Sequence, residues 1–169
     1  KRLFQNSICK GQRNNGYSKF PFNKGSLILV IPLSGIWCYF YQMQIKVFIY
    51  DDNHPRRDSL KALIELSPEL IFCGEAINCM DVKKDMETSF PDVVLMDINM
   101  PGADGIAGLK EIKKNYPHIK VLMQTVFDDT DKIFECIRNG ASGYILKKDP
   151  AQRILQAIQE VYDGGAVMN

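Results

Sequence analysis

The sequence predicts an α/β domain in which helices cover both faces of a parallel β-sheet. From Ile45 onward, short apolar runs rich in β-branched residues alternate with stretches whose apolar residues recur at helical spacing, five times each. Strands and helices that alternate in this way favour parallel strands joined by right-handed crossovers. The length of 169 residues suits one domain of ordinary size with an extension.

Five segments are predicted to be strands, because each is a short apolar run bounded by polar or turn-forming residues. They are Lys46–Tyr50, Leu70–Glu75, Val93–Asp97, Lys120–Gln124 and Gly143–Leu146. We interpret Val93-Val94-Leu95-Met96 as the central strand.

Helices are predicted between the strands, because apolar side chains at helical spacing would cover one face of the sheet. The stripes are Leu60/Leu63/Ile64, Ile106/Leu109/Ile112, Ile133/Phe134/Ile137 and Ile154/Leu155/Ile158/Val161, and Val82 with Met86 marks a weaker second helix. Pro55 and Pro150 suit first-turn positions, while Gly140 and Gly164 suit positions just past helix ends.

The segment from Lys1 to Gln44 differs from the rest of the chain in composition. Its basic, Asn- and Gly-rich start precedes the apolar run Ser26 to Tyr41, which Pro32 and Gly35 interrupt. That run is shorter than the roughly 20 residues of a spanning helix, and it lacks the small-residue cleavage site of a signal peptide. Because Met43 directly precedes the first strand, we interpret the native start as Met43 and the extension as upstream or non-native sequence.

Charge and cysteine content narrow the classes of function. Lys and Arg number 21 against 20 Asp and Glu, so no global basic field indicates nucleic-acid or membrane binding. The cysteines are odd in number and form no CxxC pair, which predicts a reduced, cytoplasmic protein. They are Cys9, Cys38, Cys73, Cys79 and Cys136.

Polar residues follow the predicted strands at the ends where ligands bind in open parallel sheets. In strand order these ends carry Asp51 and Asp52, Asp97, Gln124 and Thr125, and Lys147 and Lys148. Taken singly, they could be an exposed turn, a strand terminator or a solvated lysine pair. Their joint placement predicts that three carboxylates, a hydroxyl and an ammonium group converge.

Converging carboxylates repel one another unless a cation neutralises them, and oxygen ligands of this kind suit Mg²⁺. We expect Asp52 and Asp97 to ligate the ion directly and Asp51 through water. Asp97 is the natural nucleophile, since an aspartate carboxylate can accept a phosphoryl group as an acyl phosphate. Lys147 and the Thr125 hydroxyl would pair with the phosphoryl oxygens.

From Ile45 to about Asn169, the chain resembles the receiver domains of two-component response regulators. The resemblance is carried by Asp51-Asp52, Val-Val-Leu-Met-Asp97-Ile-Asn-Met-Pro101-Gly-Ala-Asp104-Gly105, Val-Leu-Met-Gln-Thr125 and Gly143-Tyr-Ile-Leu-Lys147-Lys-Asp. It implies a flavodoxin-like, doubly wound sheet of five parallel strands in the order 2-1-3-4-5, with five helices. Val126 departs from the small residue that many members carry after the threonine.

The resemblance also implies a role for each site residue. Asp97 is the phosphoacceptor, Asp51 and Asp52 are the metal-site acids, Thr125 is the switch hydroxyl, Lys147 pairs with the phosphoryl group, Asn99 gives its backbone carbonyl to Mg²⁺, and Tyr144 is the switching aromatic. Lys148 is a competitor for the role of Lys147. No enzymatic turnover beyond self-phosphorylation and autodephosphorylation is implied.

The C-terminal part and Phe127-Asp128-Asp129 resemble regulators of the NarL/FixJ type. This resemblance implies a sensor histidine kinase as partner, a homodimer on phosphorylation, and an output surface of the fourth helix, fifth strand and fifth helix. It implies DNA binding only through a helix-turn-helix output domain absent from this chain, and no membrane partner. The chain is therefore expected to be a receiver cut from a longer regulator.

Four alternatives belong to other classes. A haloacid-dehalogenase-type phosphatase needs a second aspartate two residues after the nucleophile, where this chain has Asn99. A flavodoxin-like nucleotide or flavin binder needs a Gly/Ser/Thr-rich loop after the first strand, where Asp51-Asp52-Asn53 would repel phosphate. A pseudo-receiver would lack an acid, the hydroxyl or the lysine, and none is lost. A stand-alone receiver acting by protein–protein interaction stays open.

Overall fold

The computed structural model describes residues 28–33, 36–41, 44–102, 104–126 and 130–167. By its internal contacts the chain forms two compact units, Lys1–Tyr41 and Gln42–Asn169. In the first unit, β1 (Ile28–Leu33) pairs antiparallel with β2 (Ile36–Tyr41). The apolar run therefore forms paired strands, as its β-branched and aromatic residues favour. Met43, the predicted start, lies outside the described residues, and the assignment of Lys1 to Gln44 as an extension stays a prediction.

The second unit contains one sheet of five parallel strands in the spatial order β4-β3-β5-β6-β7. The strands are β3 (Ile45–Tyr50), β4 (Leu70–Ala76), β5 (Val93–Asp97), β6 (Lys120–Thr125) and β7 (Gly143–Leu146). Numbered within this sheet, the order is 2-1-3-4-5, which confirms the predicted fold class. Ile45, Ala76 and Thr125 extend the predicted strands by one residue each, because each has a partner on the neighbouring strand.

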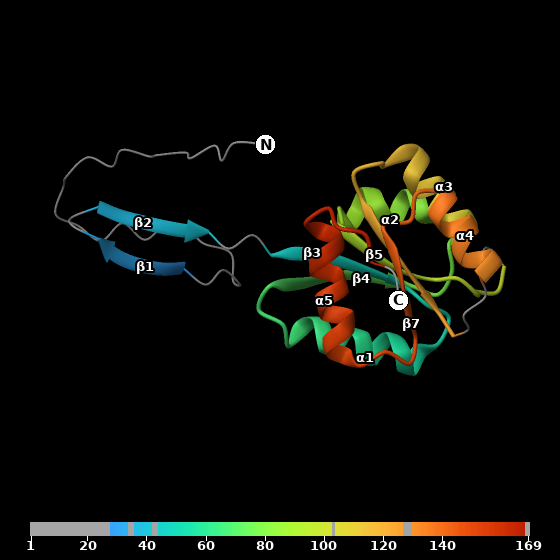
Figure 1. Cartoon of the computed structure of the whole chain (residues 1–169), viewed down its shortest axis with the longest axis horizontal. Helices are drawn as coiled ribbons and strands as arrows, with labels where there is room; N and C mark the ends of the chain where they lie inside the picture. The colour runs from blue at the N-terminus through green and yellow to red at the C-terminus, as the bar shows by residue number, and fades with distance from the viewer. Residues whose placement is uncertain (1–27, 34–35, 42–43, 103, 127–129, 168–169) are drawn as a thin grey trace. The chain divides into compact units, whose positions relative to one another are not determined.

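In the described part of this unit, five helices cover the two faces of the sheet (Figure 1). One face carries α1 (His54–Glu65) and α5 (Ala151–Tyr162), and the other carries α2 (Val82–Ser89), α3 (Gly105–Asn115) and α4 (Thr130–Arg138). Successive side chains of β5 alternate between the faces: Val93 and Leu95 join the core under α1 and α5, and Val94 and Met96 join the other. The central strand is thus buried on both sides.

One member of the predicted apolar stripes is exposed. Phe134 is 57% exposed, and the buried position of α4 is Cys136. The prediction for this residue was wrong, because a side chain two positions from Cys136 points about 200° away around a helix.

The helix boundary signals are largely confirmed. Asn53 caps α1, its side-chain oxygen accepting a hydrogen bond from the Arg56 amide, and Pro55 lies in the first turn. Gly140 and Gly164 adopt φ of +87° and +92° just past α4 and α5, a conformation that favours glycine. Pro150 is the residue before α5 rather than a member of its first turn.

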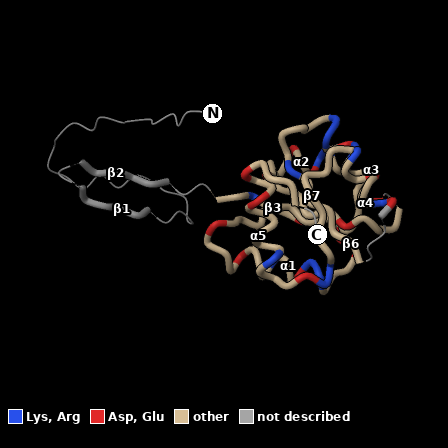
Figure 2. Tube along the Cα trace, viewed as in Figure 1, with Lys and Arg blue, Asp and Glu red and all other residues tan. Residues whose placement is uncertain are grey.

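Acidic and basic residues are interspersed along the trace of the second unit (Figure 2). This distribution agrees with a net charge of +1 and with the expectation of no global basic field. Among the described residues, no helix combines the length and apolar character that crossing a membrane requires.

Candidate functional site

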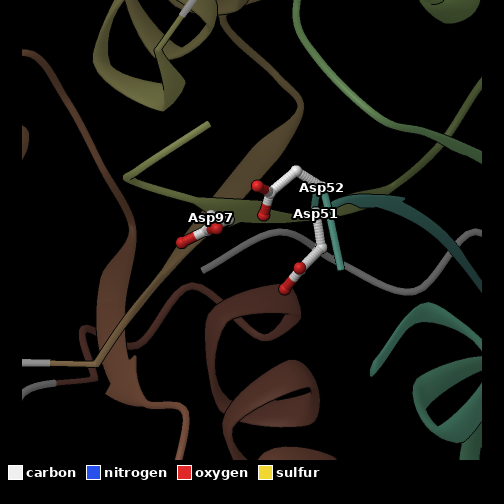
Figure 3. Close-up of side chains that lie close together, drawn as sticks. All are labelled: Asp51, Asp52 and Asp97. Atoms are coloured by element: carbon white, nitrogen blue, oxygen red, sulfur yellow. The ribbon is translucent and has the colours of Figure 1, made fainter. Parts of the chain in front are cut away.

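Three aspartates gather at the carboxyl ends of β3 and β5 (Figure 3). Asp51 and Asp52 follow β3, and Asp97 is the last residue of β5. One carboxylate oxygen of each lies within 4.8 Å of the other two. Asp51 and Asp97 are buried, whereas Asp52 is exposed, so solvent reaches the cluster on the side of Asp52.

Hydrogen bonds and close packing with the surrounding chain hold the two buried aspartates in place. The Asn53 amide donates a hydrogen bond of 2.9 Å to Asp51 Oδ1, and Arg57 donates one of 2.8 Å to the Asp51 carbonyl. The Asn99 amide lies 3.3 Å from Asp97 Oδ1. The start of α3 packs directly on Asp97, because a Cβ atom added to Gly105 would overlap the Asp97 carbonyl. Both carboxylates are therefore anchored by the chain around them.

Lys147 brings a positive charge to this cluster. It directly follows β7, and its amide donates a hydrogen bond of 2.7 Å to the carbonyl of Thr125. Its Nζ atom lies 2.7 Å from Asp97 Oδ2 and 2.9 Å from Asp51 Oδ2. Lys148, the competing lysine, is exposed. The structure thus brings Lys147, and not Lys148, to the acids.

The ammonium group of Lys147 neutralises the negative charge of the acid cluster only in part. Burial raises the pKa of Asp97 above its ordinary value and Asp51 adds to the effect, while the ammonium group of Lys147 opposes them. Within the described part of the chain, Asp51 Oδ2 is buried without a hydrogen-bond partner of suitable geometry, although Lys147 Nζ lies close to it. Oxygen ligands with an incompletely neutralised charge fit Mg²⁺.

Thr125 is the last residue of β6, which lies next to β5, and Tyr144 lies on β7, the strand beyond β6. Asp97 pairs with Gln124 on β6, so Thr125, which is 3% exposed, lies one residue beyond Asp97 along the neighbouring strand. Tyr144 is half-buried on the edge strand β7 and packs against the core on the α2–α4 side. Asn99 is exposed in the loop after β5, where its side-chain oxygen accepts a hydrogen bond from Lys132 on α4.

Two residues of the site were not recognised as such from the sequence. Arg56, in the first turn of α1, donates hydrogen bonds of 2.8 Å to the carbonyl of Lys147 and to Gln124 Oε1. Gln124 was noted only as a strand end. The one available signal was that α1 begins two residues after Asp52, which puts its first turn beside the acids.

Lys147 should stabilise the fold in the absence of divalent cations. We expect Lys147→Met to lower the free energy of unfolding by about 3 kcal/mol, because two buried carboxylates lose their nearest counter-ion. Lys148→Met is the matched control and should change it by less than about 0.5 kcal/mol. Urea unfolding in EDTA measures both, and equal stability of the two variants would contradict the assignment of Lys147 as the counter-ion.

Comparisons with known proteins agree with this geometry. Residues 47–159 match the family model described as the response regulator receiver domain. The chain is 40% identical over 124 residues to the transcriptional regulatory protein LnrK of Bacillus subtilis, covering 73% of this chain and 56% of that protein. It is 32% identical over 126 residues to the transcriptional regulatory protein DegU of Brevibacillus brevis, covering 75% and 53%. The chain thus spans about half the length of these curated relatives.

Solved structures give the same similarity. A two-component response regulator of the LuxR family from Aurantimonas sp. SI85-9A1 superposes with a TM-score of 0.70 at 26% identity, covering 74% of this chain and 89% of that one. The signal receiver domain of the putative response regulator NarL from Mycobacterium tuberculosis superposes with a TM-score of 0.67 at 25% identity, covering 72% and 98%.

Proposed function

The chain belongs to the response regulator receiver domain family, and on that basis we propose that Asp97 accepts a phosphoryl group in a reaction that requires Mg²⁺. The observation that carries the proposal is the geometry around Lys147. One ammonium group contacts both Asp51 and Asp97 while three carboxylates lie within 4.8 Å of one another. A receiver domain needs such a set of acids, one of which reacts, beside a cation that can pair with phosphate.

In the proposed reaction, a carboxylate oxygen of Asp97 attacks the phosphorus atom of a phosphohistidine in a sensor kinase, or of a small acyl phosphate. A P–O bond to Asp97 forms as the P–N or P–O bond of the donor breaks, and the bonding electron pair leaves with the donor. Lys147 exchanges its contact with Asp97 for the phosphoryl oxygens, and the Thr125 hydroxyl donates to them. Water later hydrolyses the acyl phosphate, so the chain acts as a stoichiometric substrate.

Asp51, Asp52, Asp97 and the backbone carbonyl of Asn99 are the proposed ligands of Mg²⁺, with Asp51 acting through water. Bound Mg²⁺ would neutralise the acids and stabilise the charge of the transferred group. The exposure of Asp52 supports this assignment, because it leaves the cluster open on one side for the ion and its waters.

Phosphorylation is proposed to change the surface formed by α4, β7 and α5. The new charge favours one of two arrangements in which Thr125 moves towards the phosphoryl group and Tyr144 turns inward. The half-buried position of Tyr144 on the edge strand supports such a movement. The resulting surface would form a homodimer.

The whole protein is proposed to be a transcriptional regulator whose partner is a sensor histidine kinase. The curated relatives are transcriptional regulatory proteins that this chain matches over about half their length, which supports a helix-turn-helix output domain that binds DNA. A kinase partner and the unpaired thiols of Cys73, Cys79 and Cys136 support a cytoplasmic location.

Removal of Mg²⁺ tests the proposed chemistry. The wild-type chain incubated with acetyl phosphate and MgCl₂ should gain one phosphoryl group per chain, measured by intact-mass spectrometry, and none in excess EDTA. Asp52→Asn should require about tenfold more MgCl₂ for half-maximal labelling, because an anionic ligand is lost. Asp58→Asn, which removes an exposed acid from α1, is the control and should behave as the wild type. Equal labelling in MgCl₂ and EDTA would refute the requirement for Mg²⁺.

A further inference from the structure

Gln124 is a polar residue that lies beside Asp97 on a largely apolar face of the sheet. Its side chain is fully buried, and the neighbouring Leu95 and Leu122 belong to the core under α1 and α5. Its Oε1 atom accepts a hydrogen bond of 2.8 Å from Arg56, whereas its Nε2 atom is without a partner among the described residues. Burying an amide side chain costs free energy unless it is hydrogen-bonded. The hydrogen bond from Arg56 offsets this cost, so Gln124 stabilises the inward position of the Arg56 guanidinium.

The guanidinium held by Gln124 contacts two other parts of the phosphoryl-transfer site. A second nitrogen, Nη1, donates a hydrogen bond of 2.8 Å to the carbonyl of Lys147. The Nε atom lies 3.8 Å from Asp51 Oδ2. The side chain of Arg56 is 22% exposed. One planar guanidinium group therefore joins the start of α1 to the ends of β6 and β7. Arginine can make these contacts together because its N–H donors are fixed in one plane, whereas the single ammonium group of a lysine cannot.

These contacts have two different consequences. The bond to the Lys147 carbonyl restrains the main chain from which the flexible lysine side chain reaches Asp97. The positive charge beside Asp51, in contrast, competes with any cation that the acids bind, because two positive charges at one buried carboxylate repel each other. Positioning depends on the hydrogen bonds of Arg56, while competition depends only on its charge.

We infer that Arg56, held by Gln124, is a positioning residue that fixes the main chain at Lys147 and weakens the affinity of the acid cluster for Mg²⁺. The inference rests on the proposed function, because it assumes that the cluster binds Mg²⁺ and that Asp97 takes up phosphoryl. Arg56, in the first turn of α1, would thus help to set the Mg²⁺ concentration that phosphorylation of Asp97 requires.

Two substitutions of Arg56 separate charge from hydrogen bonding. Arg56→Met removes both and keeps an unbranched apolar stem, so we expect about three- to tenfold tighter Mg²⁺ binding. Arg56→Lys keeps the charge but cannot bridge the Lys147 carbonyl and Gln124, so its Mg²⁺ affinity should stay within about twofold of the wild type. At saturating Mg²⁺, both variants should be phosphorylated about tenfold more slowly, because Lys147 is less well placed.

Isothermal titration of the full chain with MgCl₂ gives the affinity, and the rate of labelling by acetyl phosphate at saturating MgCl₂ gives the second readout. Lys61→Met removes the same charge from an outer position of α1, beside Phe72, and should leave both quantities unchanged. Gln124→Leu packs against the neighbouring Leu95 and Leu122 and removes the hydrogen bond to Arg56, so it should lower the labelling rate even if Arg56→Met fails to fold. Far-UV circular dichroism without Mg²⁺ checks the fold of each variant.

A purely structural role for Arg56 would lower stability without tightening Mg²⁺ binding. The inference is overturned if folded Arg56→Met binds Mg²⁺ no more tightly than the wild type, or if Arg56→Met and Gln124→Leu are labelled at the wild-type rate. A wild-type chain that neither binds Mg²⁺ nor becomes phosphorylated would instead overturn the proposed function, and the inference with it.

Discussion

Asp97→Asn is expected to take up no phosphoryl group from acetyl phosphate under conditions that label the wild type completely. The substitution keeps the shape of the side chain at the end of β5 but replaces the nucleophilic oxygen anion with a neutral amide. Asp51, although it also contacts Lys147, is fully buried, is held by the Asn53 amide and the Arg57 guanidinium, and should not substitute for Asp97. Intact-mass spectrometry after incubation measures the loss.

The loss should not result from unfolding. Because burial holds the pKa of Asp97 above its ordinary value, the folded state carries the ionised carboxyl at a cost near neutral pH. That cost is fully present above the raised pKa, decreases as the pH falls through it, and is gone below the ordinary pKa of the unfolded chain. The uncharged asparagine should therefore leave the thermal stability of the metal-free chain unchanged or higher. Asp104→Asn, which preserves the N-cap of α3, should be labelled normally, whereas labelling of Asp97→Asn would refute Asp97 as the acceptor.

Gly105→Ala should both destabilise the fold and prevent phosphorylation. A Cβ atom at this position would overlap the carbonyl oxygen of Asp97 and lie 2.9 Å from its carbonyl carbon. Relief requires α3 to move away from β5 or the backbone of Asp97 to shift. We expect a loss of about 2–4 kcal/mol in the free energy of unfolding, with labelling reduced to background.

Gly108→Ala is the matched comparison for this effect, since it makes the same substitution one turn further along α3. Its Cβ atom would meet the side chain of Cys79 and not the backbone of the site. It should lower stability by about 1–3 kcal/mol while the folded protein is still labelled. Urea unfolding and intact-mass spectrometry distinguish the two, and normal labelling of Gly105→Ala would show that the packing of α3 on Asp97 is not required.

Much of the fold was predictable because it depends on patterns that are local in the sequence. The apolar runs of β3 to β7 and the helical stripes between them predicted alternating strands and helices, and that alternation favours a parallel sheet. Strand ends such as Ala76 and Thr125 were missed by one residue, because the pairing partner decides them. Phe134 was misassigned because apolar character alone did not distinguish the buried face of α4 from its exposed face.

The convergence of Asp51, Asp52 and Asp97 was determined by the sequence itself, because the carboxyl ends of parallel strands meet at one edge whatever the details of packing. The resemblance to receiver domains already favoured Lys147 over Lys148, whereas tertiary structure alone decided that Arg56 joins Gln124 to Lys147. The physical reason is distance along the chain. Arg56 lies 68 and 91 residues from its two partners, and side chains so far apart meet only where the packing of α1 against the sheet brings them together.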